Sequence, residues 1–147
     1  MLLAAVAVLA ACREAAVTEE DLEKAETSWR SRGIESYEID VVLSGGPERR
    51  VHVAVRDGAI AEATVTEHSI VRALNEAQAR PYTVEGLFRT LAVELRGGER
   101  RFVRVWFDAR CGFPAHMELG PRRDRPEGSV LLLRVERFET PSSGELC

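Results

Sequence analysis

Apolar residues recur at helical spacing near the start of the chain. Leu22 and Trp29 lie on one stripe, which begins after Thr18 and Asp21, two residues with the spacing of a capping box. Gly33 follows the last apolar position and ends the run. We therefore predict a short amphipathic helix with Thr18 as its N-cap.

A second helical stripe lies in the middle of the chain. Thr83 is a candidate N-cap, and Gly97-Gly98 ends the segment. The apolar positions between them follow an i, i+3, i+4, i+7, i+11 pattern: Val84, Leu87, Phe88, Leu91 and Leu95. A partner-binding helix has the same pattern, but a domain of this size needs its apolar helices for its own core, so we assign this stripe to the core.

Between the two helices, apolar and polar residues alternate, which is the pattern of half-buried strands. Three segments share it: residues 37–43, 51–55 and 59–66. Asp57-Gly58 joins the last two and is the signature of a type I′ hairpin turn. Antiparallel pairing of these strands follows from the short connections.

The third of these segments alternates less regularly. A two-residue turn places Glu62 opposite Val53, so we expect a bulge or an exposed edge near Glu62. Residues 67–82 have no steady period and contain Pro81. They are interpreted as a connection with one loose helical turn over residues 71–79.

Strand patterns return in the last third of the chain, at residues 102–108, 115–119 and 130–138. The order is helix, three strands, helix, three strands. We predict an α+β domain with a mostly antiparallel sheet of about six strands and two helices packed on one of its faces.

The first eleven residues are an uncharged apolar run that ends in Leu9-Ala10-Ala11-Cys12, the pattern of a bacterial lipoprotein signal and its lipobox. The run is shorter than the roughly 20 residues of a membrane-spanning helix. We predict that residues 1–11 are removed, that Cys12 is lipidated, that residues 12–18 form a short tether, and that residues 19–147 form a single globular domain. Arg13 follows the lipidated cysteine, where aspartate favours retention in the inner membrane.

This signal predicts a lipid-anchored protein of the cell envelope, on the periplasmic side of the outer membrane if the cell has two membranes. The partner is then the membrane, through the lipid on Cys12. Another envelope protein or a polysaccharide is a candidate second partner. The net charge of −4 argues against nucleic acid, because binding to phosphates requires a basic face.

Two arginine clusters stand out in the charge pattern. They are Arg100, Arg101 and Arg104 in one segment and Arg122, Arg123 and Arg125 in another. We interpret them as a solvated strand end and a loop, because acidic residues lie nearby in the sequence. The alternative is contact with an anionic lipid headgroup or a polysaccharide.

The two cysteines other than Cys12 are Cys111 and Cys147. An oxidising envelope permits a disulfide between them, and we predict this bridge. A redox or catalytic thiol is the alternative, but the chain has no C-x-x-C spacing to support it.

Candidate catalytic and metal-binding residues are few. His116 and Glu118, at i and i+2, share a strand face, but no third ligand accompanies them, and there is no H-E-x-x-H or G-x-S-x-G motif. We assign no catalytic residue, no metal and no cofactor. Trp106 shares its strand face with Arg104 and Asp108, and these three form a possible binding surface; a half-buried packing role for Trp106 is the interpretation we favour.

Several sequence blocks suggest a family. In chain order they are Trp29 followed by Tyr37, Val55-Arg56-Asp57-Gly58, Thr83-Val84-Glu85-Gly86-Leu87-Phe88, Trp106-Phe107-Asp108 and Gly112-Phe113-Pro114. Together they resemble the bacterial domain-of-unknown-function family 6174 over about residues 22–138. The resemblance implies a secreted protein or lipoprotein and brings no activity with it. The chain departs from the family in its first hairpin, which reads Leu43-Ser44-Gly45-Gly46 without a cysteine pair, and at Leu119-Gly120, which lacks an expected acid.

We therefore predict a lipid-anchored envelope protein that acts as a non-catalytic binding or structural module. The alternative is a small envelope enzyme of hydrolase type, with a site near Asp108, His116 and Glu118. An enzyme requires a pocket in which acids or histidines converge, whereas a binding module requires an exposed patch.

Overall fold

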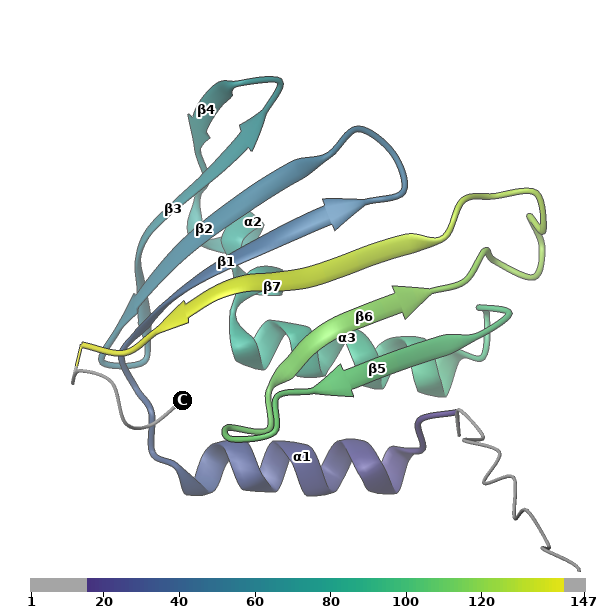
Figure 1. Cartoon of the computed structure of the whole chain (residues 1–147), viewed down its shortest axis with the longest axis horizontal. Helices are drawn as coiled ribbons and strands as arrows, with labels where there is room; N and C mark the ends of the chain where they lie inside the picture. The colour runs from purple at the N-terminus through teal and green to yellow at the C-terminus, as the bar shows by residue number, and fades with distance from the viewer. Residues whose placement is uncertain (1–15, 142–147) are drawn as a thin grey trace, which may run out of the picture.

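The computed structural model describes residues 16–141. In this part of the chain seven strands form one antiparallel sheet, in the order β4-β3-β2-β1-β7-β6-β5 (Figure 1). Their bounds are β1 Tyr37–Ser44, β2 Arg49–Arg56, β3 Ala59–Glu67, β4 Ile70–Ala73, β5 Val103–Phe107, β6 Pro114–Leu119 and β7 Leu131–Glu139. The last strand, β7, pairs with the first, β1, in the centre of the sheet, so strands from distant parts of the chain lie side by side there.

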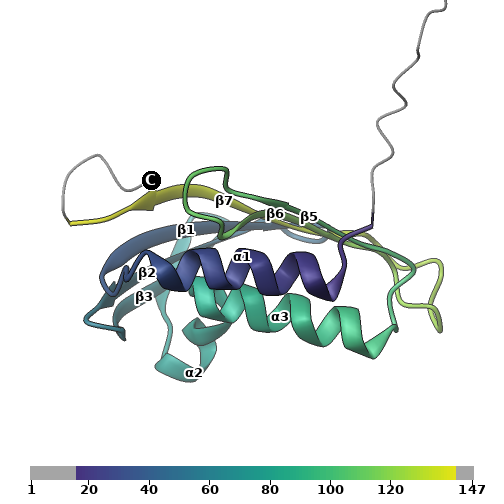
Figure 2. The same ribbon diagram turned by 90° about the horizontal axis from the view of Figure 1, so that it is seen from below.

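The two long helices lie on the same face of the sheet (Figure 2). They are α1, Glu19–Ser31, and α3, Val84–Gly97; the short α2, Glu76–Ala79, and the 3-10 helix η1, Arg80–Tyr82, precede α3. The predicted α+β class is confirmed. The described chain has seven strands and three α-helices, one more of each than expected.

The helix ends follow the capping signals in the sequence. Thr18 Oγ1 accepts a hydrogen bond from the Asp21 amide at 3.2 Å, and the Asp21 carboxylate accepts one from the Thr18 amide at 3.0 Å. At the start of α3, Thr83 Oγ1 accepts a hydrogen bond from the Gly86 amide at 3.0 Å. Gly98 ends α3 in the left-handed conformation, with φ of 59°.

The sequence interpretation of residues 67–82 was correct in part. The helical turn expected over residues 71–79 is present as α2, Glu76–Ala79, but the strand before it was not expected. Ile70–Ala73 forms the edge strand β4 against β3, and Asn75 starts α2 with a capping box of its own. All four residues of β4 are exposed, so no alternation of apolar and polar positions marks the strand. His68 and Ser69 turn the chain with positive φ without a glycine to signal the turn.

The hairpin between β2 and β3 has the predicted turn and the predicted irregularity. Asp57 and Gly58 have φ of 49° and 77°, as a type I′ turn requires. The register shifts after Ala54, so Glu62 lies opposite Ala54 and the bulge expected near Glu62 is confirmed.

The core lies between the sheet and the two long helices. The predicted α3 stripe is buried at Val84, Leu87, Phe88 and Leu91, each at most 2% exposed, and Leu95 packs on it partly buried. The inward side chains of the strands complete the core: Ile39, Val41, Val51, Val53, Val55, Ala63, Val65, Met117, Leu119 and Leu133.

A polar contact at the edge of this core joins α1, β1 and α3. The carboxylate of Glu85 accepts hydrogen bonds from Trp29 Nε1 at 3.1 Å and from the Tyr37 hydroxyl at 2.9 Å. The same hydroxyl accepts a hydrogen bond from the Val84 amide at 3.1 Å. Burial, reinforced by the negative charge of Glu85, raises the pKa of Tyr37 far above its ordinary value. The hydroxyl therefore stays protonated and donates to Glu85.

We expect Tyr37→Phe to lower the free energy of unfolding by about 2 kcal/mol, because the buried Val84 amide loses its partner and Glu85 loses a donor. Urea unfolding followed by circular dichroism measures the change. Tyr82→Phe is the matched control: Tyr82 is partly buried and has no side-chain hydrogen bond in the described structure, so its hydroxyl adds little. Equal losses from both variants would contradict the role given to Tyr37.

Candidate functional site

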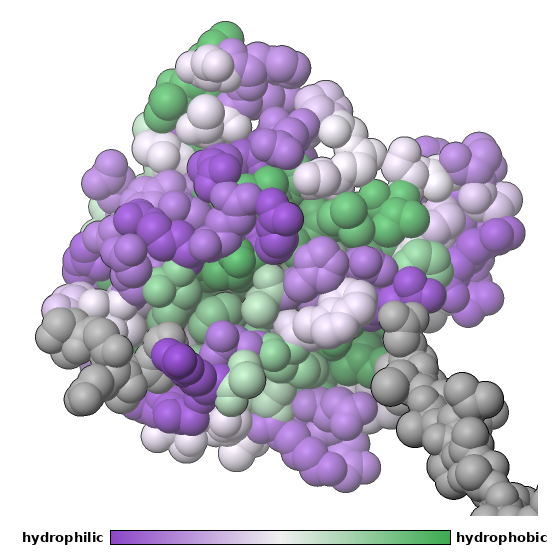
Figure 3. Space-filling model, in the orientation of Figure 1, coloured by the Kyte–Doolittle hydropathy of each residue, from purple (hydrophilic) through white to green (hydrophobic). Residues whose placement is uncertain are grey.

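One face of the sheet carries no helix formed by residues 16–141, and we call it the open face (Figure 2). It presents the outward side chains of β5, β6, β7, β1 and β2. Hydrophilic colour covers much of it, with hydrophobic patches between the charged groups (Figure 3). Two groups of side chains on this face are ordered by mutual contacts: one around Trp106 and one across β1, β2 and β7.

The Trp106 group consists of Arg104 and Trp106 on β5 and His116 and Glu118 on β6. The register pairs Arg104 with Glu118 and Trp106 with His116. The Trp106 and His116 rings lie 4.9 Å apart between centroids, and Arg104 Nη1 lies 3.3 Å from Glu118 Oε2. His116 Nε2 is 3.4 Å from Glu118 Oε1. Trp106 is 43% exposed, so one part of its ring packs on His116 and the rest faces solvent.

Asp108, the third residue of the predicted binding surface, has a different setting. Its carboxylate accepts hydrogen bonds from the backbone amides of Arg110 and Cys111, at 2.9 and 2.7 Å, in the turn between β5 and β6. The structure thus brings together Arg104, Trp106, His116 and Glu118, while Asp108 holds the turn at the end of β5.

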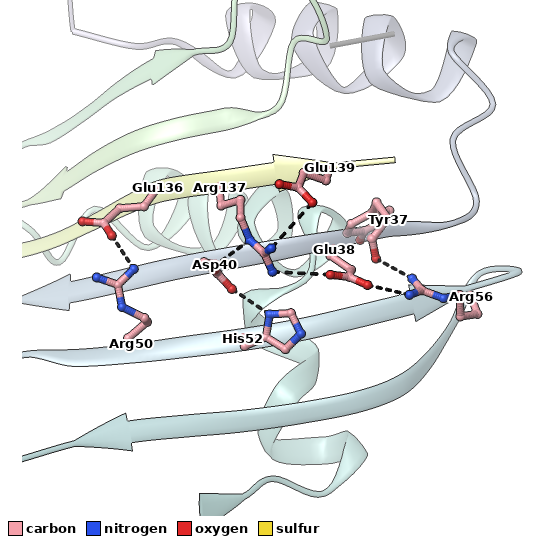
Figure 4. A network of polar contacts seen from close by, with 9 residues as sticks. All are labelled: Tyr37, Glu38, Asp40, Arg50, His52, Arg56, Glu136, Arg137 and Glu139. Carbon is pink, nitrogen blue, oxygen red and sulfur yellow. Dashed lines mark hydrogen bonds and ion pairs between the residues drawn. The ribbon is translucent and has the colours of Figure 1, made fainter. Parts of the chain in front are cut away.

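The second group is a ladder of charged residues across β2, β1 and β7 (Figure 4). Asp40 is its centre: Oδ1 lies 2.7 Å from His52 Nδ1, and Oδ2 lies 3.0 Å from Arg137 Nε. Arg137 also contacts Glu38 at 3.4 Å and Glu139 at 3.5 Å.

The ladder continues to both sides of these residues. Arg56 Nη2 lies 2.7 Å from Glu38 Oε1, and Glu136 binds Arg134 at 2.6 Å and also Arg50. Hydrogen bonding from Arg56 lowers the pKa of Glu38, and hydrogen bonds from Arg134 and Arg50 lower the pKa of Glu136. Acid and base alternate along the ladder, so its charges are largely compensated within the face.

Sequence reasoning missed the ladder. Its members come from three strands that are far apart in the chain, and β1 pairs with β7 through a register shift after Asp40. The sequence did hold one signal for it: charged or polar residues occupy every second position, Glu38 and Asp40 on one strand and Arg50 and His52 on the next.

Neither a metal-binding group nor a membrane-spanning helix is found among residues 16–141. Within residues 16–141, no three or more His, Cys, Asp or Glu residues are grouped to hold a metal ion. In the same range no helix has the length and apolar character to cross a membrane. A shallow cavity of about 280 Å³ lies between η1 and α3, lined largely by apolar atoms of residues such as Pro81, Gly86 and Val93.

The three cysteines are only partly described. Cys111 is fully buried in the turn between β5 and β6, beside the core residue Phe113. Cys12 and Cys147 lie outside the described residues, so lipidation of Cys12 and a Cys111–Cys147 bridge stay predictions.

The described residues form a small α+β domain in which both long helices lie on one side of the sheet. The model of DUF6174, a family of unknown function, matches residues 21–130, and the chain belongs to this family. No curated protein matches the chain significantly.

The lowered pKa of Glu38 predicts a pH dependence of stability. A carboxyl whose pKa falls on folding stabilises the folded state above its unfolded value, about 4.5, and this contribution is lost as the pH drops through the folded value. We expect Glu38→Gln to be less stable than the wild type at pH 7 and equal to it at strongly acidic pH. Urea unfolding across this range measures the difference.

Glu23→Gln is the control for this measurement, because Glu23 is exposed on α1 and has no charged partner among residues 16–141. Its effect on stability should stay near zero throughout. A stability deficit of Glu38→Gln that persists unchanged at acid pH would contradict the role given to the Glu38 carboxylate.

Proposed function

We propose that this protein is a lipid-anchored, non-catalytic binding module of the cell envelope and that it binds a partner protein through the open face around Trp106. The observation that carries the proposal is a large aromatic side chain, 43% exposed, on a sheet face that no helix covers. Tryptophan and arginine contribute most of the binding energy in many interfaces.

The surroundings of Trp106 support a specific contact. His116 packs against the ring, and Glu118 contacts both His116 and Arg104. These contacts restrict the side chains before a partner arrives, which lowers the entropy cost of binding. The partner surface that fits is an apolar or aromatic side chain flanked by groups that pair with an arginine and a glutamate.

The anchor is supported by the beginning of the domain. The helix α1 starts at Glu19, behind a complete capping box at Thr18. Five residues, 13–17, separate that cap from the lipobox cysteine, Cys12. The folded domain is then held close to the membrane, facing the periplasm in a cell with two membranes, where the open face meets other envelope proteins.

A disulfide between Cys111 and Cys147 is part of the proposal. Phe113 and Phe138 lie 4.7 Å apart between ring centroids, so the turn that carries Cys111 is adjacent to the end of β7. Eight residues, 139–146, separate Phe138 from Cys147, a sufficient length to return to that turn. A disulfide would close the loop from Cys111 to Cys147, and in the chain-entropy model a loop of that length stabilises the fold by about 4 kcal/mol. Alkylation of the purified protein should label both thiols only after reduction.

The binding role is tested by photocrosslinking in the native host. The full chain carries a photoreactive amino acid in place of Trp106 or, as the matched control, in place of Val93, which is 65% exposed on α3. We expect a discrete adduct with one envelope protein from position 106 and none from position 93. The absence of an adduct at position 106, or the same adducts from both positions, would contradict the proposal.

A further inference from the structure

The two arginine clusters of the sequence meet at one end of the domain. Arg100 and Arg122 form an isolated antiparallel bridge, and the Arg101 amide donates to the Pro121 carbonyl at 3.0 Å. On the other side, Arg123 Nε donates to the Gly98 carbonyl at 3.0 Å. Segments about twenty residues apart in the chain thus form one surface.

We call this surface the arginine end and define it as Arg96, Arg100, Arg101, Arg122, Arg123 and Arg125. Residues 96–101 and 121–127 together hold six arginines and three acidic residues, a formal charge of +3 in a chain whose net charge is −4. Glu19 and Glu94 pair with Arg96 and Arg100 and lower the formal charge of this surface to +1. Arg104, which the sequence analysis grouped with Arg100 and Arg101, does not belong to this surface, because it pairs with Glu118 on the open face.

Some of these arginines are neutralised and some are not. Arg100 pairs with Glu94 at 3.0 Å, and Arg122 pairs with Asp124 at 3.1 Å. Arg101, Arg123 and Arg125 are exposed and form no ion pair with a carboxylate in the described part of the chain, and the charge of Arg125 also acts on the neighbouring Asp124. These three guanidinium groups can therefore reach an external anion.

The arginine end is also the end at which α1 begins. Arg96 Nε lies 3.6 Å from Glu19 Oε2, in the first turn of α1. Figures 1 and 2 both place the start of α1, the end of α3 and the connection between β6 and β7 at the same end of the molecule. A lipid on Cys12 is separated from this end by residues 13–17, which span at most about 17 Å.

We propose that the arginine end binds the anionic phospholipid headgroups of the membrane that holds the lipid on Cys12. This inference rests on the proposed lipid anchor and adds a second contact with the same membrane. The anchor holds the arginines close to the surface, and each basic residue there adds about fivefold to the ratio of docked to undocked domain, the equivalent of about 1 kcal/mol. Docking at this end leaves the open face, which lies along the side of the molecule, accessible to a partner.

The test uses the full chain, purified from a host that processes lipoproteins and reconstituted into vesicles. The vesicles contain phosphatidylcholine alone or phosphatidylcholine with phosphatidylglycerol. Amide hydrogen exchange of residues 98–102 and 120–125, measured by mass spectrometry, reports the docking. We expect exchange in both segments to be several-fold slower on the anionic vesicles and high salt to remove the difference.

Matched double variants distinguish the effect of charge at the arginine end from the effect of the total charge of the protein. Arg101→Ala/Arg125→Ala should lower the docked-to-undocked ratio about 30-fold and abolish the protection. Arg101→Lys/Arg125→Lys should retain it. Arg49→Ala/Arg89→Ala removes the same charge from two exposed arginines that likewise lack a partner within residues 16–141, and it should leave the protection intact.

Equal exchange of the wild type on the two kinds of vesicle would overturn the proposal, and so would equal loss from the Arg101/Arg125 and Arg49/Arg89 alanine variants. If Cys12 carries no lipid, the chain does not remain on vesicles of phosphatidylcholine alone. This result is distinguishable from a lack of headgroup binding by the arginine end. Protection by anionic vesicles can then still be measured on the chain added from solution.

Discussion

The carboxylate of Glu85 is the contact on which the arrangement of the layers depends. This carboxylate accepts hydrogen bonds from the indole N–H of Trp29 on α1 and from the hydroxyl of Tyr37 on β1. The Tyr37 hydroxyl in turn accepts a hydrogen bond from the first amide of α3, that of Val84. One acidic side chain therefore fixes both long helices relative to the central strand. Phe113 and Phe138 pack against the same aromatic rings and connect this point to the turn after β5 and to the end of β7.

The blocks that carry the family resemblance are explained largely by this architecture. In the segment around Glu85, Thr83 caps α3, Leu87 and Phe88 are core residues, and Gly86 lies under η1, where an added Cβ would sit 2.0 Å from the Arg80 carbonyl oxygen. In the later blocks, Asp108 holds a turn and Phe113 belongs to the aromatic cluster. These residues serve the fold, whereas Trp106, in the same block as Asp108, is the exposed residue to which the proposed binding role is assigned.

Local signals in the sequence were sufficient for much of the fold. The caps at Thr18 and Thr83, the Asp57-Gly58 turn and the bulge near Glu62 all depend on neighbours in the chain, and all four were found. The strand β4 was not predicted, because all four of its residues are exposed and show no alternation of buried and exposed positions. The strand order, with β7 beside β1, also required the tertiary structure.

The surface features depend on register and not on local pattern. Arg104 and Trp106 were predictable as one strand face, and His116 and Glu118 as another, but their pairing into one group is set by the alignment of β5 with β6. The charge ladder around Asp40 and the junction of Arg100 with Arg122 likewise join residues from distant parts of the chain. No spacing rule in a single sequence reports such contacts.

We propose that a lipid on Cys12 holds the domain at the membrane surface. The intact mass of the protein purified from the envelope of its native host, compared with the Cys12→Ser variant, tests for this lipid. We expect a wild-type chain that begins at residue 12 and carries the added mass of the acyl groups, and a variant without them. A wild-type protein of unmodified mass that still carries residues 1–11 would contradict the claim.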